Sequence, residues 1–134
     1  MSSGSLHTAF FHSVELCIAF AAVAFGGFIG AVLRYLVDTG IVLTLPGTLV
    51  VNTTGCFFLG IFMYESMYLG RFSQTTRQFC AVGIIGSYTT FSALEVQSFA
   101  AGPLIGVANL VVTLLLGFFA IWLGRLVILY RRFS

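Results

Sequence analysis

Four long stretches without a charged residue constrain the fold of this chain more than any other feature of its sequence. They run from Leu16 to Leu33, from Ile41 to Tyr64, from Gln78 to Leu94 and from Val96 to Gly124. A helix needs about 20 residues to cross the hydrocarbon of a bilayer. The pattern therefore predicts an all-α membrane protein with four transmembrane helices.

The spans are expected near residues 14–35, 47–68, 76–100 and 104–130. They leave a polar N-terminal tail at residues 1–13 and a basic C-terminal tail at residues 131–134. The connections between spans are short and contain glycine and proline, which break helices. The N-terminal tail lacks Lys and Arg, so we expect the first span to be retained, not cleaved as a signal peptide.

The composition agrees with a chain that lies mostly in membrane lipid. Charged residues are 7% of the 134 residues, whereas a soluble domain carries about a quarter. The net charge of +2 gives no indication of nucleic-acid binding. His7, His12 and the three cysteines follow no spacing typical of a metal site or a disulfide framework. No pattern for covalent chemistry is present, and we do not expect an enzyme.

Polar residues inside the spans are the best indicators of function, because lipid penalises them. Asn52 lies in the second span beside Val50 and Val51, so its amide must meet protein, water or a ligand. It either joins two helices by a hydrogen bond or binds a solute that crosses the membrane, and the sequence leaves both interpretations open.

The third span is a poor continuous helix. Glycines and several hydroxyl-bearing residues lie between Gly83 and Ser92, with Thr89 and Thr90 adjacent. We expect a broken helix, in preference to an ordinary one whose hydroxyls bond back to its own carbonyls. A break exposes carbonyls that coordinate cations and N–H groups that favour anions. Glu95 follows, and it belongs either to a functional site or to the membrane interface.

Two further pairs of polar residues lie at helical spacing. Arg34 and Asp38 are four residues apart, which allows an ion pair, and we expect a structural role for both. Asn109 and Thr113 share a face of the fourth span, where they either bond another helix or line a pathway.

Four helices of this length bury little between them, so an oligomer is expected. Small residues in the first two spans allow the close helix approach on which membrane packing depends. They are Gly26, Gly30, Gly55 and Gly60.

Three motifs together resemble the Fluc (CrcB) family of fluoride channels. Residues 26–35 read GGFIGAVLRY and resemble the family's GGxxGAxxRY. Residues 48–60 read TLVVNTTGCFFLG and resemble its TLxVNxxGxFxxG. Residues 83–95 read GIIGSYTTFSALE and are similar to its GxxGxxTTFS motif, with the acidic residue beyond it. The motifs lie in order on the first three predicted spans.

The resemblance implies a fluoride-specific channel that exports fluoride passively across the plasma membrane and lowers its toxicity in the cytoplasm. It also implies an antiparallel dimer with two pores and one structural sodium ion that is not transported. The backbone carbonyls of Gly86 and Thr89 match the sodium ligands. The residues assigned to the fluoride pathway are Asn52, Thr90, Phe91, Ser92, Leu94, Glu95 and Thr113.

Two residues depart from the family pattern. Ser87 stands where a second glycine is frequent, and Leu94 where a second pore phenylalanine is common. Leu94 has no aromatic ring edge to offer an anion. The partner in the dimer is therefore either a second copy of this chain or an oppositely oriented paralogue.

A small four-helix proton-coupled multidrug exporter is the alternative function. It would need a titrating carboxylate deep in a span, for which Glu95 is the candidate. A third interpretation, a membrane subunit that transports nothing, would not need the combination of Asn52 and Phe91.

Arginines are distributed unequally between the two sides of the predicted membrane domain. The side of both termini carries Arg71, Arg77, Arg131 and Arg132, whereas the other side carries Arg34. If the orientation is fixed, the positive-inside rule predicts cytoplasmic termini.

Overall fold

The computed structural model describes the backbone of residues 3–40 and 45–133 and the side chains of residues 12–40 and 47–132. The described residues form helices, with no strand among them. The helices are α1 (Ser3–Gly40), α2 (Leu45–Tyr68), α3 (Gln74–Arg77), the π-helix η1 (Gln78–Ile85), α4 (Gly86–Tyr88), α5 (Phe91–Ala100) and α6 (Pro103–Phe133).

Four segments are long and apolar enough to cross a membrane. They are His12–Gly40, Gly47–Tyr68, Gln74–Ala100 and Pro103–Arg132. Each one contains the core of a predicted span, so the prediction of four transmembrane segments is confirmed.

The two ends of the chain are more helical than the sequence predicted. Residues 3–13, expected as a polar tail, continue α1 toward the N-terminus, and residues 131–133 continue α6. No proline interrupts either stretch, so the helices can extend beyond the apolar segments. At 38 and 31 residues, α1 and α6 are about 57 Å and about 46 Å long, longer than the ~30 Å of hydrocarbon.

Glycine and proline lie in the connections between spans, as the sequence predicted. Gly70 and Gly102 have φ angles of 59° and 86°, a left-handed conformation that residues with a Cβ rarely adopt. Pro46 is the second residue of α2, where its missing N–H has no partner to lose. The connection before it, residues 41–44, lies outside the described residues.

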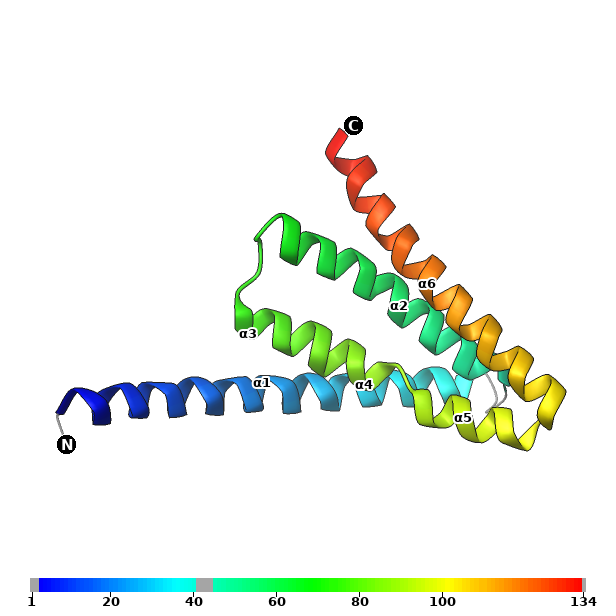
Figure 1. Ribbon diagram of the computed structural model, residues 1–134, viewed down its shortest axis with the longest axis horizontal. Helices are drawn as coiled ribbons and strands as arrows, with labels where there is room; N and C mark the ends of the chain where they lie inside the picture. Colours follow the sequence, from blue (N-terminus) through cyan, green and yellow to red (C-terminus); the bar gives the residue numbers. More distant parts are fainter. Residues whose placement is uncertain (1–2, 41–44, 134) are drawn as a thin grey trace.

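The helices pack in two neighbouring pairs (Figure 1). The long α1 runs beside η1 and α4, and α2 runs beside α6. A tight turn at Gly102 folds α6 back on α5, so these two helices form a hairpin at one end of the molecule. The third span thus joins the two pairs, since its first half contacts α1 and its second half contacts α6.

Glycines let the helices of each pair approach to backbone contact. A Cβ on Gly30 would lie 2.9 Å from the carbonyl carbon of Ile84 in η1. A Cβ on Gly60 would lie 2.9 Å from the Cα of Ile121 in α6. The predicted use of small residues for close packing is confirmed, and these contacts lie within one subunit.

The third span is broken, as predicted. Its first half ends in the π-helix η1 and the short α4, and its second half is α5. Between the halves, Thr89 and Thr90 are extended, with ψ angles of 154° and 120°. Their β-branched side chains suit an extended backbone better than a helical one. The kink between α4 and α5 is visible beside the middle of the molecule in Figure 1.

Candidate functional site

The break opens onto a cavity of about 340 Å³ between α2, the third span and α6. Most of the residues assigned to the site from the sequence line it together. They are Asn52 on α2, Gly86 on α4, Thr89 and Thr90 in the break, Phe91 and Leu94 on α5, and Thr113 on α6. Three distant segments of the chain therefore bring their polar groups to one place.

Asn52 makes two hydrogen bonds to the backbone of Thr90. Its Nδ2 donates to the Thr90 carbonyl at 2.9 Å, and its Oδ1 accepts from the Thr90 N–H at 2.8 Å. The side chain thus pairs with an extended residue as a neighbouring β-strand would. Of the two interpretations left open by the sequence, bonding to another part of the chain is confirmed. One N–H of the amide is still available to the cavity, since a primary amide has two.

Backbone donors that would continue the helix are diverted at the break. In an α-helix the Thr90 N–H would bond the Gly86 carbonyl, four residues earlier, but it bonds Asn52 instead. The Ala93 N–H would bond the Thr89 carbonyl, but it bonds the Thr90 hydroxyl at 3.3 Å. Thr90 is therefore the N-cap of α5. The carbonyls of Gly86 and Thr89 therefore lose their helical donors, as do those of Ser87 and Tyr88 between them.

Arg34 approaches the break from the side of α1. Its Nη1 lies 3.5 Å from the Thr89 carbonyl oxygen, a long hydrogen bond. Asp38 is also described, and the ion pair that the spacing allowed does not form, because Arg34 turns toward the break instead. The ion pair found among the described residues lies outside the cavity, where Arg71 Nη1 is 3.5 Å from Glu65 Oε1.

Thr113 supplies an unpaired hydroxyl to the cavity wall. Its side chain is 4% exposed, and its Oγ1 has no hydrogen-bond partner among the described residues. Buried hydroxyls are usually bonded, so an unpaired one beside a cavity indicates a ligand or water. Asn109, one turn earlier on α6, instead donates to the Ser98 hydroxyl at 2.8 Å. Asn109 therefore bonds another helix, and Thr113 lines the cavity.

Phe91 and Leu94 contribute to the cavity in different ways. Phe91 is 57% exposed, whereas Leu94 is 1% exposed and packed within the subunit. The ring of Phe91 is consequently available to a neighbouring molecule, and the Leu94 side chain is part of the core.

Two of the residues assigned to the pathway do not line this cavity. Ser92 is exposed, and its hydroxyl lies 3.4 Å from that of Thr90 at the start of α5. Glu95 is exposed on another groove, between α5 and α6, with Ser98 and Phe99. Residue 95 is one helical turn from Phe91, but the turn carries it past the cavity wall to the α6 side of α5.

The sequence did not single out two polar contacts that the structure shows. Gln97 accepts a hydrogen bond from the Thr48 hydroxyl at 2.5 Å, which ties α5 to α2. The hydroxyls of Thr54 and Tyr88 lie 2.9 Å apart and tie α2 to α4. Glutamine and threonine are polar residues within predicted spans, and their position there was the sequence feature that could have indicated these contacts.

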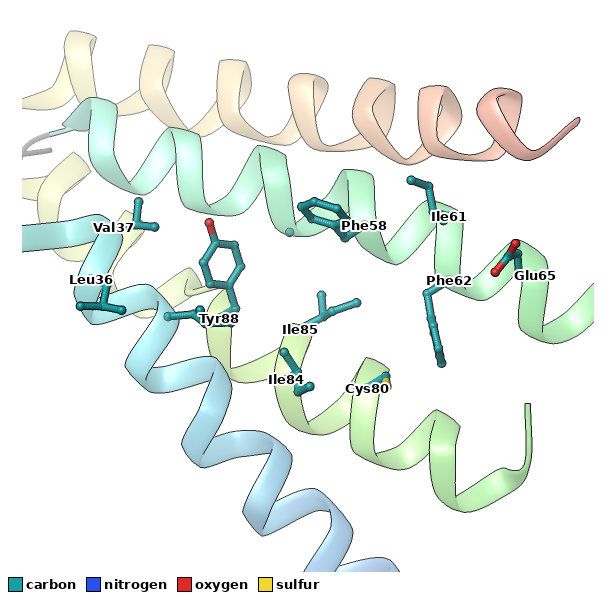
Figure 2. Close-up of a pocket in the computed structure, with 12 residues that line it drawn as sticks. Leu36, Val37, Phe58, Ile61, Phe62, Glu65, Cys80, Ile84, Ile85 and Tyr88 are labelled. Carbon is teal, nitrogen blue, oxygen red and sulfur yellow. The ribbon is translucent and has the colours of Figure 1, made fainter. Parts of the chain in front are cut away.

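A second hollow lies on the opposite side of the third span. This apolar groove, of about 550 Å³, is bounded by α1, α2 and η1 (Figure 2). Figure 2 shows Phe58, Ile85 and Tyr88 along it, with Glu65 at one end. Its side chains are mostly aliphatic or aromatic, so it suits lipid or another apolar surface more than an ion.

The amino-acid sequence is similar to those of a known protein family. Residues 21–125 match the family described as CrcB-like protein, Camphor Resistance (CrcB). The chain belongs to the CrcB family. The match covers all three motifs and most of the four spans, so the CrcB resemblance drawn from residues 26–95 extends to α6.

Curated CrcB relatives carry names that state a function. The chain is 43% identical over 114 residues to "Fluoride-specific ion channel FluC 1" of Methanospirillum hungatei, covering 85% of this chain and 81% of that protein. It is 43% identical over 112 residues to the protein of the same name from Methanosarcina acetivorans, covering 78% and 86%. It is 37% identical over 119 residues to "Fluoride-specific ion channel FluC" of Thermotoga maritima, covering 79% and 94%.

Proposed function

We propose that this chain is a fluoride-specific ion channel and not an enzyme, and that it exports fluoride passively across the plasma membrane. The observation that carries the proposal is the cavity at the break. It presents the Asn52 amide, the unpaired Thr113 hydroxyl and the exposed Phe91 ring, and no charged side chain lines it among the described residues. Its relatives named as fluoride-specific channels support the same conclusion.

Neutral donors suit the passage of fluoride. The ion is small and strongly hydrated, so a narrow pathway must replace its water with hydrogen-bond donors. A fixed positive charge would hold it too tightly, because conduction requires binding that is weak enough to reverse. The Asn52 amide, the Thr113 hydroxyl and the positive edge of the Phe91 ring each offer a weak interaction.

The cavity does not suit a proton-coupled multidrug exporter. Such a transporter needs a carboxylate that exchanges a proton for a cationic substrate inside the membrane domain. Glu95, the candidate, is exposed on the groove between α5 and α6 and does not line the cavity.

A structural sodium ion is part of the proposal. Diversion of the Thr90 and Ala93 donors releases the Gly86 and Thr89 carbonyls from helix pairing, and released carbonyls at a helix break are the type of ligand that sodium takes. Sodium would supply a fixed positive charge that is coordinated by the lone pairs of these carbonyl oxygens inside the membrane domain. Gly86 and Thr89 are therefore the residues that would hold the ion, since the Thr89 oxygen keeps a second lone pair beside its long 3.5 Å contact with Arg34.

We also propose an antiparallel dimer. Two carbonyls fill only part of the shell that a dehydrated cation requires, and a second subunit related by a two-fold axis would present the same pair. Phe91, exposed over 57% of its surface, would then meet the partner and not lipid. The partner is a second copy of this chain, or a paralogue with the opposite orientation.

The arginines favour one orientation of the subunit. Three of the six arginines, Arg71, Arg131 and Arg132, line one pocket at the end of α2 and α6. We propose that this end is cytoplasmic. Single engineered cysteines near each terminus, labelled from either side of the membrane, test it. Labelling from both sides with intact fluoride flux would support a homodimer that inserts both ways; labelling from one side would support a paralogue.

Efflux from proteoliposomes tests the function. Purified protein should release trapped fluoride when a potassium ionophore balances the charge, without any pH gradient, and should leave trapped chloride inside. Equal release of both anions would contradict a fluoride-specific channel. Uptake of a cationic dye that requires a proton gradient would support the exporter instead.

A further inference from the structure

The linker between α4 and α5 is held open from two sides. Asn52 of α2 bonds the N–H and the carbonyl of Thr90, at 2.8 and 2.9 Å. Arg34 of α1 donates to the Thr89 carbonyl at 3.5 Å. The contact with Asn52 is the stronger, because both distances are those of good hydrogen bonds and the two bonds form together.

The bond to the Thr90 N–H decides whether the helix can close. Without an acceptor on α2, this donor would be unpaired inside a membrane domain, where an unsatisfied backbone N–H strongly destabilises the fold. Its nearest alternative partner along the chain is the Gly86 carbonyl, the partner it would have in a continuous helix. Loss of Asn52 therefore favours rejoining α4 to α5, and the rejoined helix would occupy the Gly86 carbonyl.

We propose that Asn52 is the positioning residue of the break, so that one side chain couples the cavity to the carbonyls of Gly86 and Thr89. This inference rests on the proposed function, because it concerns the sodium ion proposed there. Asn52 lines the cavity and makes both of its hydrogen bonds to the break, so one side chain belongs to both. Its removal should therefore weaken sodium binding as well as fluoride passage.

A residue that served only as a fluoride ligand would behave differently. Thr113 provides that comparison, since its hydroxyl faces the same cavity and bonds no atom of the break among the described residues. Thr113→Val keeps the shape of the side chain and removes the hydroxyl. It should lower fluoride flux and leave the response to sodium unchanged.

The experiment measures the thermal stability of the purified protein as sodium replaces N-methyl-glucamine. We expect the wild type to be stabilised by sodium, and Asn52→Leu to need at least tenfold more sodium for the same half-effect. Thr113→Val should stay within about twofold of the wild type, the spread expected of residues that share no interaction, because its hydroxyl bonds no described atom of the break. If Asn52→Leu does not assemble, Asn52→Ser, which is shorter and cannot make both bonds, carries the same measurement.

Two results would overturn the inference. One is an Asn52 variant that loses fluoride flux while its sodium half-effect equals that of the wild type, which would make Asn52 an anion ligand only. The other is a wild-type protein whose stability does not respond to sodium. Fluoride efflux by the wild type in liposomes is measured separately, so that a failure of this coupling can be told from a failure of the channel assignment.

Discussion

The contact between α2 and α6 at Gly60 gives a sharp prediction about stability. In Gly60→Ala the new Cβ would lie 2.9 Å from the Cα and 3.0 Å from the carbonyl carbon of Ile121. Carbon atoms pack comfortably at about 3.5–4.0 Å, so the helices must separate by roughly 0.5–1 Å. Both atoms belong to the backbone of α6 and cannot turn aside as a side chain would.

The size of the effect follows from two opposing terms. Overpacking of a tight interior costs about 1–3 kcal/mol, and the backbone contact places this change at the upper end. Alanine regains about 1 kcal/mol of helix propensity over glycine. We therefore expect a net loss of about 2 kcal/mol, or roughly a 30-fold fall in the ratio of folded to unfolded protein.

Two other glycines are matched controls. In Gly117→Ala the new Cβ would lie 3.3 Å from the Sγ of Cys56, a side-chain atom that can move. In Gly40→Ala nothing lies within 4 Å. The loss of stability should be largest for Gly60→Ala and smaller for Gly117→Ala. Gly40→Ala should lose no stability.

Trp122 is the single tryptophan of the chain and follows Ile121 in the sequence. Its fluorescence therefore reports on this interface. Unfolding with increasing sodium dodecyl sulfate in a mild detergent should show an earlier midpoint for Gly60→Ala. If its midpoint equals that of Gly40→Ala, α2 and α6 are not packed at Gly60 and the arrangement of the helices is wrong.

Three further changes give predictions of different kinds. Phe91→Ile should lower fluoride efflux at least tenfold without changing folding, because the ring is 57% exposed; full flux would remove Phe91 from the pathway. Leu94→Phe should destabilise the protein by about 1–3 kcal/mol, since Leu94 is 1% exposed and a larger side chain must displace its packed neighbours, and an unchanged unfolding midpoint would refute this packing. Asn109→Ala loses the 2.8 Å bond to Ser98 and should cost about 0.6–1 kcal/mol in a detergent unfolding titration, with no loss of fluoride efflux.

The spans and the break could be predicted because their signals are local. Apolar length fixes the number of crossings, and adjacent β-branched residues such as Thr89 and Thr90 disfavour a helix wherever they occur. The glycines of α1 and α2 could likewise be recognised as packing residues, although the sequence does not say whether they face another subunit or another helix of the same one.

The partners of individual side chains could not be predicted, because they depend on how the helices turn against each other. Asn52 and Thr90 are 38 residues apart, and no spacing along the chain indicates their two bonds. Helical spacing suggested an ion pair between Arg34 and Asp38. Because α1 packs closely on the third span, Arg34 instead donates a hydrogen bond to the Thr89 carbonyl. The same rotation of α5 that buries Leu94 carries Glu95 away from the cavity.

The most direct test of the central claim, passive and selective conduction of fluoride, is the reversal potential of the current in a planar bilayer. With a tenfold fluoride gradient and equal chloride on both sides, the account predicts reversal about 59 mV from zero, at the equilibrium potential of a monovalent anion. The reversal potential should not change when a pH gradient is added. Reversal near zero, or a value that follows chloride or protons, would contradict it.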